Sequence, residues 1–207
     1  MKLLCKTLSC MVMATAGVTA NAAQITFTDG LYSTVSHVTY VDFESGLPSA
    51  YSGAGSVINF SEDARTAAPA GDDTYYYSVA YPDSNGTGTF QAAAGVSYDY
   101  FGLYWGSIDD YNTLSFYSNG SLIATINGLD VIAAGAALGD QNAAGANRYV
   151  NFWFDTTFDR IDFSTTDFAF ETDNHAFANT AVPAPAPLAL FAAGLLGIGF
   201  STRRRRS

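Results

Sequence analysis

Side chains that could hold a divalent cation lie near both ends of the central part of the chain. Asp42 and Glu44 close an early apolar segment, and Glu171, Asp173 and Asn174 belong to a late one. Carboxylate and amide oxygens are the ligands that Ca²⁺ prefers. If an early strand meets the last strand, these five residues form one calcium site. The alternative is that the acidic turn residues only serve solubility.

A second, smaller set of oxygen donors is the loop Asp83-Ser84-Asn85-Gly86, which lacks the rest of an EF-hand loop. Catalytic signatures are absent: there is no Gly-x-Ser-x-Gly elbow, His-Glu-x-x-His helix, P-loop or dinucleotide fingerprint. His37 and His175 stand in no recognisable constellation, and we interpret both as polar strand or turn residues. Carboxylates without a flanking motif give no specific support to glycoside hydrolysis. We therefore expect a protein that is not an enzyme.

Aromatic side chains are concentrated in two stretches, 98–111 and 149–163. In the second stretch Tyr149 and Trp153 alternate with Val150, Phe152 and Phe154, so a strand there has two different faces. Together with Tyr104 and Trp105, the face of Tyr149 and Trp153 could form a flat platform on which sugar rings stack. The alternative is that both faces are buried. The four platform residues are Tyr104, Trp105, Tyr149 and Trp153.

The charge of the chain is strongly uneven. Residues 24–181 contain all nineteen acidic residues and only three basic ones, Arg65, Arg148 and Arg160, which gives a formal net charge of −16. Such a domain repels phosphate backbones and anionic membranes, so nucleic acid is excluded as a partner. The acidity suits solubility outside the cell or the binding of divalent cations.

The N-terminus has the layout of a secretory signal peptide. Lys2 and Lys6 precede an apolar run from Leu8 to Val18, and Ala20-Asn21-Ala22 is a small-x-small cleavage site. We expect residues 1–23 to form a signal helix that is removed, with Ala20 and Ala22 at the cleavage site. The two cysteines, Cys5 and Cys10, lie within the signal, so the mature chain has no disulfide.

Short runs of Tyr, Phe, Thr, Val and Ile, broken by Gly, Asn, Asp and Ser, predict β structure over residues 24–181. Asn119-Gly120 predicts a tight hairpin. The fold expected is all-β, an antiparallel β-sandwich of the jelly-roll or lectin-like kind. The Ala/Gly-rich stretch 131–147 is expected to be a loop with at most one or two helical turns. The expected strands are Ile25–Thr28, Val35–Phe43, Val57–Phe60, Tyr75–Tyr81, Gly88–Ala93, Ser97–Tyr104, Thr113–Tyr117, Leu122–Ile126, Arg148–Phe154, Arg160–Ser164 and Phe168–Glu171.

The C-terminal residues 182–207 consist of three blocks: a proline-alternating entry, an apolar run and an arginine cluster. The prolines keep the entry extended. The apolar run, Leu188–Phe200, spans only roughly 20 Å as a helix, short of the ~30 Å bilayer core. The arginines resist crossing and stay on the cytoplasmic side. The residues that define the signal are Val182, Pro183, Pro185, Arg203, Arg204, Arg205 and Arg206. A plain C-terminal anchor helix is the alternative.

This tail resembles the PEP-CTERM sorting signal of Gram-negative bacteria, with Ala184 where glutamate is usual. Three internal stretches are similar to surface proteins that carry such tails: the Tyr-Phe-Gly-x-Tyr-Trp-Gly-Ser-x-Asp-x-Tyr-Asn run at 100–112, Ala-Pro-Ala-Gly-Asp-Asp-Thr at 68–74, and Phe-Glu-Thr-Asp-Asn at 170–174. The resemblance implies processing by an exosortase-type membrane protease, after transient anchoring in the inner membrane. It also implies a final place at the cell surface or outside the cell.

The function expected is that of a structural or interaction component associated with exopolysaccharide. The alternative is a glycan-binding, lectin-like module that uses the aromatic face, with Ca²⁺ as its only candidate cofactor.

Overall fold

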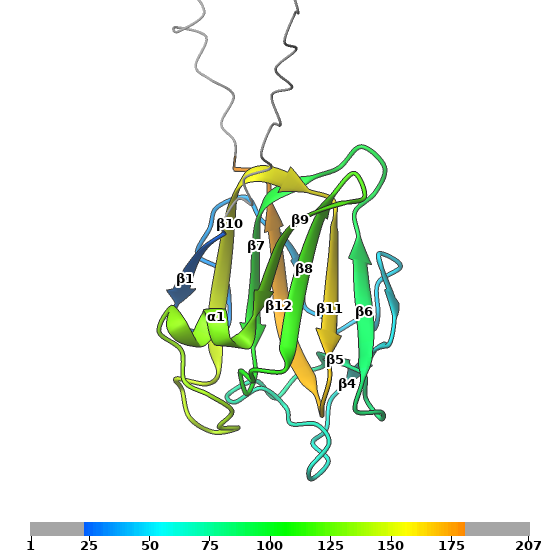
Figure 1. The fold of residues 1–207 in the computed structure, drawn as a ribbon. Coiled ribbons are helices and arrows are strands. Elements are labelled where there is room, and N and C mark those ends of the chain that lie inside the picture. The colour runs from blue at the N-terminus through cyan, green and yellow to red at the C-terminus, as the bar shows by residue number, and fades with distance from the viewer. Residues whose placement is uncertain (1–22, 181–207) are drawn as a thin grey trace, which may run out of the picture.

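Strands of alternating burial build two antiparallel sheets that pack face to face (Figure 1). The computed structural model describes residues 23–180. The larger sheet has the order β1 (Gln24–Thr28), β10 (Arg148–Phe158), β7 (Tyr98–Trp105), β12 (Phe170–Ala178), β5 (Tyr76–Val79) and β4 (Gly55–Ile58), and β2 (Thr39–Val41) also pairs with β12. The smaller sheet has the order β3 (Tyr51–Gly53), β6 (Gly86–Gln91), β11 (Arg160–Thr165), β8 (Asn112–Ser118) and β9 (Ser121–Asn127). The expected all-β antiparallel sandwich is confirmed.

The core between the sheets is aromatic. Val150, Phe152 and Phe154 of β10 face the smaller sheet, and Phe116 of β8 packs against the last two, with ring centroids 6.0 and 4.6 Å away. This interdigitation of alternate residues is how two stacked sheets fill the space between them. The alternation predicted for β10 is therefore confirmed on its inner face.

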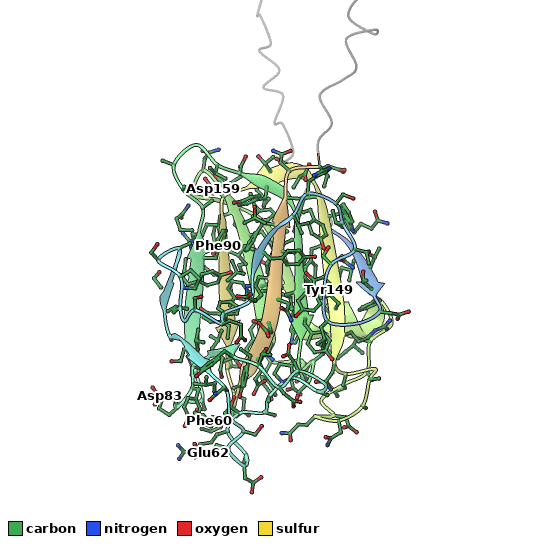
Figure 2. All side chains as sticks on the ribbon, turned by 180° about the vertical axis from the view of Figure 1, so that it is seen from behind. Phe60, Glu62, Asp83, Phe90, Tyr149 and Asp159 are labelled. Carbon is green, nitrogen blue, oxygen red and sulfur yellow. The ribbon has the colours of Figure 1, made fainter. Side chains whose placement is uncertain are left out.

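A second apolar layer covers the outer face of the larger sheet. Tyr100, Tyr104, Tyr149 and Ala176 are buried there beneath apolar side chains of the segment that follows β1, which are Leu31, Val35 and Val38. This segment runs in blue across the sheet near Tyr149 in Figure 2. It explains why the expected strand Val35–Phe43 is reduced to β2: the residues before Thr39 form a cover and not a strand.

Other elements also differ from the expectation, and β4 (Gly55–Ile58) and β10 (Arg148–Phe158) differ in their bounds. The expected strand Phe168–Glu171 is β12, which begins at Phe170 and continues to Ala178. β3 was not expected. The helix α1 (Gly128–Ala133) begins earlier than expected because Asn127 caps its N-terminus. The Asn127 Oδ1 accepts from the Asp130 backbone N–H at 3.0 Å. In return, the Asp130 carboxylate accepts from the Asn127 backbone N–H at 2.9 Å, which completes a capping box.

The predicted hairpin is confirmed. Asn119 and Gly120 join β8 to β9 with φ of +48° and +79°, which are the two positive angles that a type I′ turn requires.

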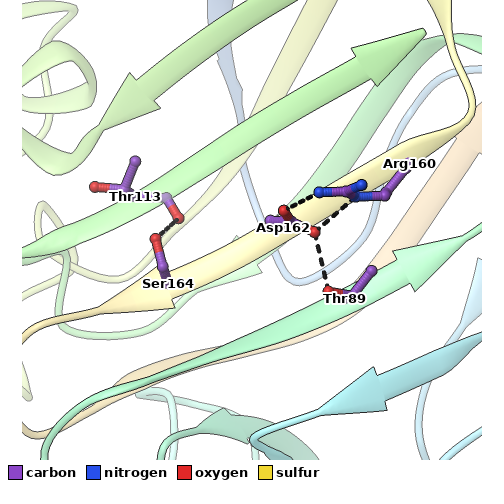
Figure 3. Close-up of polar contacts among 5 residues, drawn as sticks. All are labelled: Thr89, Thr113, Arg160, Asp162 and Ser164. Atoms are coloured by element: carbon purple, nitrogen blue, oxygen red, sulfur yellow. Dashed lines mark hydrogen bonds and ion pairs between the residues drawn. The ribbon is translucent and has the colours of Figure 1, made fainter. Parts of the chain in front are cut away.

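The outer face of the smaller sheet is polar (Figure 3). On β11, the Arg160 guanidinium pairs with the Asp162 carboxylate at 2.5 Å and lies 3.9 Å from the Tyr117 ring centroid. The Thr89 hydroxyl of β6 donates to the same carboxylate at 2.9 Å. Polar side chains outside and aromatic side chains inside fix which face of this sheet is buried.

Both ends of the described chain lie at one end of the sandwich (Figure 1). Gln24 lies level with Trp153, Tyr100 and Ala178 across four paired strands. The Asp99 carboxylate holds Thr180 there by accepting from its backbone N–H at 2.6 Å. We call the opposite end, which carries the segments 61–75, 80–85, 106–111 and 128–147, the distal end.

The expected N-terminal signal helix (1–23), apart from Ala23, and the C-terminal hydrophobic helix within 182–207 lie outside the described residues. Among residues 23–180, no helix has the length and apolarity needed to cross a membrane.

Replacing Tyr77 by phenylalanine is expected to raise the free energy of unfolding by about 1 kcal/mol. The Tyr77 hydroxyl is buried between Gly55 and Gly88 and has no hydrogen-bond partner among the described residues. The adjacent Tyr76 is the matched control, because its hydroxyl donates to the Phe60 carbonyl at 2.6 Å. Tyr76→Phe should lower stability by about 1 kcal/mol in the same urea titration. Equal losses in both variants would contradict this account.

Candidate functional site

Two buried acidic residues from different segments, Asp72 and Asp173, lie together at β12 near the distal end. β2 pairs antiparallel with β12, so the predicted meeting of an early strand with the last strand is confirmed. Burial raises the pKa of the Tyr32 hydroxyl, and the charges of Asp72, Asp173, Asp42 and Glu44 raise it further. Of the predicted calcium ligands, Asp173 and Asn174 share contacts with Asp72, whereas the Glu44 carboxylate accepts from the Tyr75 backbone N–H at 2.9 Å and Asp42 accepts from the Glu44 N–H at 3.3 Å.

Asp72 and Asp173 are connected by two further side chains. The Thr74 hydroxyl lies 2.5 Å from Oδ1 of Asp72 and 3.3 Å from Oδ2 of Asp173. Asn174, in a left-handed conformation with φ of +52°, donates its Nδ2 to Asp72 at 3.1 Å and its backbone N–H to Asp173 at 2.7 Å. The left-handed residue lies within the register shift between Asp173 and Ala176, so the β-bulge places both donors over the carboxylates.

The Asp173 carboxyl is fully buried, and burial raises its pKa to about 9, with a further contribution from the neighbouring Asp72 carboxylate. Two carboxylates this close cannot both ionise easily in a water-poor site. At neutral pH Asp173 therefore keeps its proton.

Glu171, the fifth predicted ligand, lies in a different place. Its Oε1 accepts from the Ala67 backbone N–H at 2.9 Å, and it lines a separate pocket. Within residues 23–180 there is no group of three or more His, Cys, Asp or Glu side chains that could hold a metal ion. Calcium binding by Asp42, Glu44, Asp173 and Asn174 stays a prediction.

A small polar pocket of about 150 Å³ surrounds Glu171 at the distal end. Glu171, Thr66 and Ser107 are buried in it, and Asp109 and Arg65 lie nearer its mouth. Burial raises the pKa of Glu171 to about 7, and the charge of Asp109 contributes. Burial likewise raises the pKa of Asp109, against the hydrogen bond that it accepts from the Tyr111 hydroxyl at 2.8 Å. The pocket can therefore donate protons and accept hydrogen bonds near neutral pH.

A larger pocket of about 430 Å³ lies beside it, within the size range of small-molecule sites. One wall is the segment 28–31, another is Ala70 and Gly71, and the third is the segment 142–148. Tyr104 lines it, with its hydroxyl donating to the Ala70 carbonyl at 2.6 Å. Asp29 and Asn142 are exposed at the pocket and supply hydrogen-bonding groups.

Asn147 holds together the loops that form the pockets, and the sequence analysis did not identify it. Its Oδ1 accepts from the backbone N–H groups of Ala70 and Ser107 at 3.0 and 3.1 Å. Its Nδ2 donates to the carbonyls of Asp140 and Ala143 at 2.9 and 3.1 Å. All four hydrogen bonds of one buried carboxamide are thus used to join three loops. No local motif reveals such a residue, because its partners are far apart in the sequence.

Replacing Asn147 by aspartate is expected to lower the free energy of unfolding by about 2–3 kcal/mol. The aspartate keeps the acceptor but turns a second oxygen toward the carbonyls of Asp140 and Ala143. Asn142→Asp is the matched control, since Asn142 is exposed and its replacement makes the same change in charge. It should change stability by less than about 0.5 kcal/mol in thermal unfolding. Similar losses in both variants would show that added charge, and not the lost hydrogen bonds, is responsible.

The predicted aromatic platform is wrong as an exposed surface. Trp105 is fully buried and faces the core, opposite to Tyr104, because neighbouring residues on a strand face opposite sides. Tyr149 is also fully buried, and the Tyr104 side chain is only 6% exposed, beneath the segment after β1. Of the four residues, only Trp153 is partly exposed, and its Nε1 donates to Thr26 at 3.2 Å. Burial on both faces, the alternative, is what the structure shows.

The two histidines have different surroundings. His37 lies exposed in the segment after β1, with φ of +59°. His175 lies on β12 in the aromatic core, where Nδ1 is 2.8 Å from the Tyr51 hydroxyl and Nε2 is 2.9 Å from the Thr172 hydroxyl. The predicted cleavage site (Ala20, Ala22) and sorting-signal residues (Val182, Pro183, Pro185 and Arg203–Arg206) lie outside the described residues.

Comparison with known proteins gives little. No protein-family model matches the chain, and no curated protein matches it. The solved structure titled "Crystal structure of Agl-KA catalytic domain" is similar over 72% of this chain, with 14% identity and a TM-score of 0.35. The similarity spans only 29% of that protein's length. A similarity at this level transfers neither a function nor a residue role.

Proposed function

We propose that the chain is an exported, non-enzymatic surface protein with a jelly-roll or lectin-like sandwich. A secretory signal at the N-terminus and a PEP-CTERM-like tail at the C-terminus support export and processing by an exosortase-type protease. The transient anchor is in the inner membrane, and the final place is the cell surface or the extracellular matrix. There the protein is an interaction component associated with exopolysaccharide.

The observation that carries this proposal is the position of the pockets relative to the chain ends. The first and last described residues lie at one end of the sandwich, where Gln24 and Ala178 are level across the larger sheet and Thr180 is held by Asp99. Both pockets and the acidic cluster lie toward the other end. A domain held by its tail therefore presents its distal loops outward, which suits a protein that contacts material outside the cell.

Glycan binding is the second candidate function, and the larger pocket favours it. Tyr104, Asp29 and Asn142 combine an aromatic ring with hydrogen-bonding groups in a cavity of about 430 Å³. Small-molecule sites are concave and contain a few oriented polar groups of this kind.

The sorting proposal is tested by the intact mass of the protein in cells with and without the sorting protease. We expect a chain that ends before the arginines in the first strain, and a full-length, membrane-bound tail in the second. An identical full-length tail in both strains would show that residues 182–207 are a plain anchor.

Glycan binding is tested by retention of residues 24–181 on the exopolysaccharide of the producing cell. Asp29→Ala with Asn142→Ala should abolish saturable retention if the larger pocket binds. Asp155→Ala is the charge-matched control, because Asp155 is exposed on β10 far from the pockets. Loss on Trp153→Ala would instead assign binding to the aromatic outer face. No retention of the unmodified domain would exclude direct glycan binding.

A further inference from the structure

An acceptor sequence for an added glycan begins in the connection between β5 and β6 and ends at Thr87 in β6, where the Thr87 carbonyl accepts from the Ala54 N–H at 2.9 Å. Residues 83–87 read Asp-Ser-Asn-Gly-Thr, in which Asn85 and Thr87 form the Asn-x-Thr pattern of N-linked glycosylation. Asp83 stands two positions before the asparagine, which gives the longer acidic sequence that bacterial oligosaccharyltransferases read. The connection passes from the larger sheet to the smaller one at the distal end, where Figure 2 labels Asp83.

Two other Asn-x-Ser patterns occur, at Asn59 and Asn119, and both are held by the fold. Asn119 is a turn residue of the two-residue hairpin, and its backbone N–H donates to the Asp159 carboxylate at 3.1 Å. In the Asn59 pattern, the Phe60 carbonyl accepts from the Tyr76 hydroxyl at 2.6 Å, and the Ser61 hydroxyl accepts from the Ala68 N–H at 2.9 Å.

The side chains of Asn85 and Thr87 are free, as are those of Asn119 and Ser121, so the Asn85 pattern differs from the Asn119 pattern by its threonine and its acidic Asp83. Asn85 and Thr87 are both exposed, and neither side chain hydrogen-bonds to another residue within 23–180. A transferase must bind the carboxamide and the hydroxyl together, so a pattern whose groups already have partners is a poor acceptor. Acidic Asp83 is also exposed, and acidic residues precede neither Asn59 nor Asn119 by two positions.

We propose that Asn85 is an N-glycosylation site, which rests on the proposed export because the transferase acts outside the cytoplasm. The co-substrate is a polyprenyl-pyrophosphate-linked oligosaccharide. Nδ2 of Asn85 forms a bond to the anomeric carbon, the bond from that carbon to the pyrophosphate oxygen breaks, and polyprenyl pyrophosphate leaves. The proton lost from Nδ2 passes to a base of the transferase.

The surroundings of Asn85 can accommodate the sugar. Phe60 is 45% exposed and packs edge-on against Tyr81, with ring centroids 5.6 Å apart, on the same distal end. A sugar on the neighbouring loop would cover this aromatic pair, whose faces are of the kind on which sugars pack. A bulky, solubilising glycan at the surface disturbs no buried contact.

The test expresses the full chain in a bacterium that supplies an oligosaccharyltransferase of the acidic-sequon type and its lipid-linked oligosaccharide. The intact mass of the exported protein should show loss of the signal peptide and gain of one oligosaccharide. Fragmentation should locate the sugar on Asn85. Asn85→Gln and Thr87→Val should remove the added mass completely, and Asp83→Ala should reduce the modified fraction several-fold.

Asn59→Gln and Asn119→Gln are the matched controls and should keep the added mass. An exported chain of unmodified mass overturns the glycosylation proposal and leaves export intact. A mass gain that persists in Asn85→Gln also overturns it. A chain that keeps its signal peptide overturns both proposals, since Asn85 then never meets the transferase.

Discussion

Replacing His175 by glutamine is expected to weaken the fall of the free energy of unfolding as the pH drops from 6.5 to 3. The imidazole is fully buried, and burial lowers its pKa to about 3 from the ordinary value of 6.5. Its ring stacks on Phe163 at a centroid distance of 5.2 Å and is approached edge-on by Phe43 at 5.0 Å. In this apolar cage the neutral ring is strongly preferred, because a charged group loses its hydration there.

The sign of this pH dependence follows from the difference in proton uptake between the unfolded and the folded chain. Below pH 6.5 the unfolded chain binds a proton at His175, whereas the folded chain does not until about pH 3. The stability contributed by this residue is therefore complete above pH 6.5 and is lost as the pH falls toward 3. At about 1.4 kcal/mol per pH unit, the loss over this window is about 4–5 kcal/mol.

The measurement is the difference in free energy of unfolding between the unmodified protein and His175→Gln from pH 8 to pH 3.5. The difference cancels titrations that the two proteins share. His37→Gln is the matched control, since it removes the other, exposed imidazole. It should change the free energy of unfolding by less than about 0.5 kcal/mol at pH 8. A constant difference for His175→Gln would show that its ring is protonated in the folded state at higher pH than the structure implies.

The fold was predictable from the sequence where a local residue pattern is compatible with only one backbone structure. Alternation in Val150, Phe152 and Phe154 and the Asn119-Gly120 turn both lead to the observed sheet and hairpin because local chemistry determines them. Whether the outer face of β10 meets water was not predictable, since that depends on Leu31 and the rest of a distant segment that folds over it.

β12 shows a second limit of sequence reasoning. The run Thr172–His175 is polar, which normally argues against a buried strand. In the structure it is buried because each polar group has a tertiary partner, such as Tyr51 for His175 and Asp72 for Asn174. Strand propensity cannot detect partners that are about a hundred residues away.

The candidate site was predictable in part for the same reason. β2 pairs with β12, as the sequence analysis had expected, but calcium binding by Asp42 and Glu44, which follow β2, stays a prediction. Glu171 is separated from Asp173 by two positions, and the loop 64–68 holds it in another pocket through the Ala67 N–H. Asp72 was missed because it precedes a strand that the pattern did not place beside β12.

Replacing Asp173 by asparagine is expected to stabilise the protein at neutral and alkaline pH. The folded-state pKa of about 9 lies above the ordinary value of 3.8, so between these values the unfolded chain releases a proton that the folded chain keeps. The stability that Asp173 contributes is complete below pH 3.8 and is lost as the pH rises toward 9. At pH 7 the loss is on the order of 4 kcal/mol. The amide of asparagine imitates the protonated carboxyl and does not titrate, so the variant does not lose this free energy of unfolding as the pH rises.

The same variant separates a protonated pair from a calcium site. Without a cation, Asp173→Asn should be more stable than the unmodified protein in urea titrations at pH 8, and Asp155→Asn, on the exposed side of β10, should change little. Bound Ca²⁺ favours the ionised carboxylate. If Asp42, Glu44 and Asp173 do bind calcium, millimolar Ca²⁺ must stabilise the unmodified protein more than Asp173→Asn, and a chelator must reverse that order. Equal responses of both proteins to Ca²⁺ would show that Asp173 binds no calcium and stays a buried, protonated carboxyl beside Asp72.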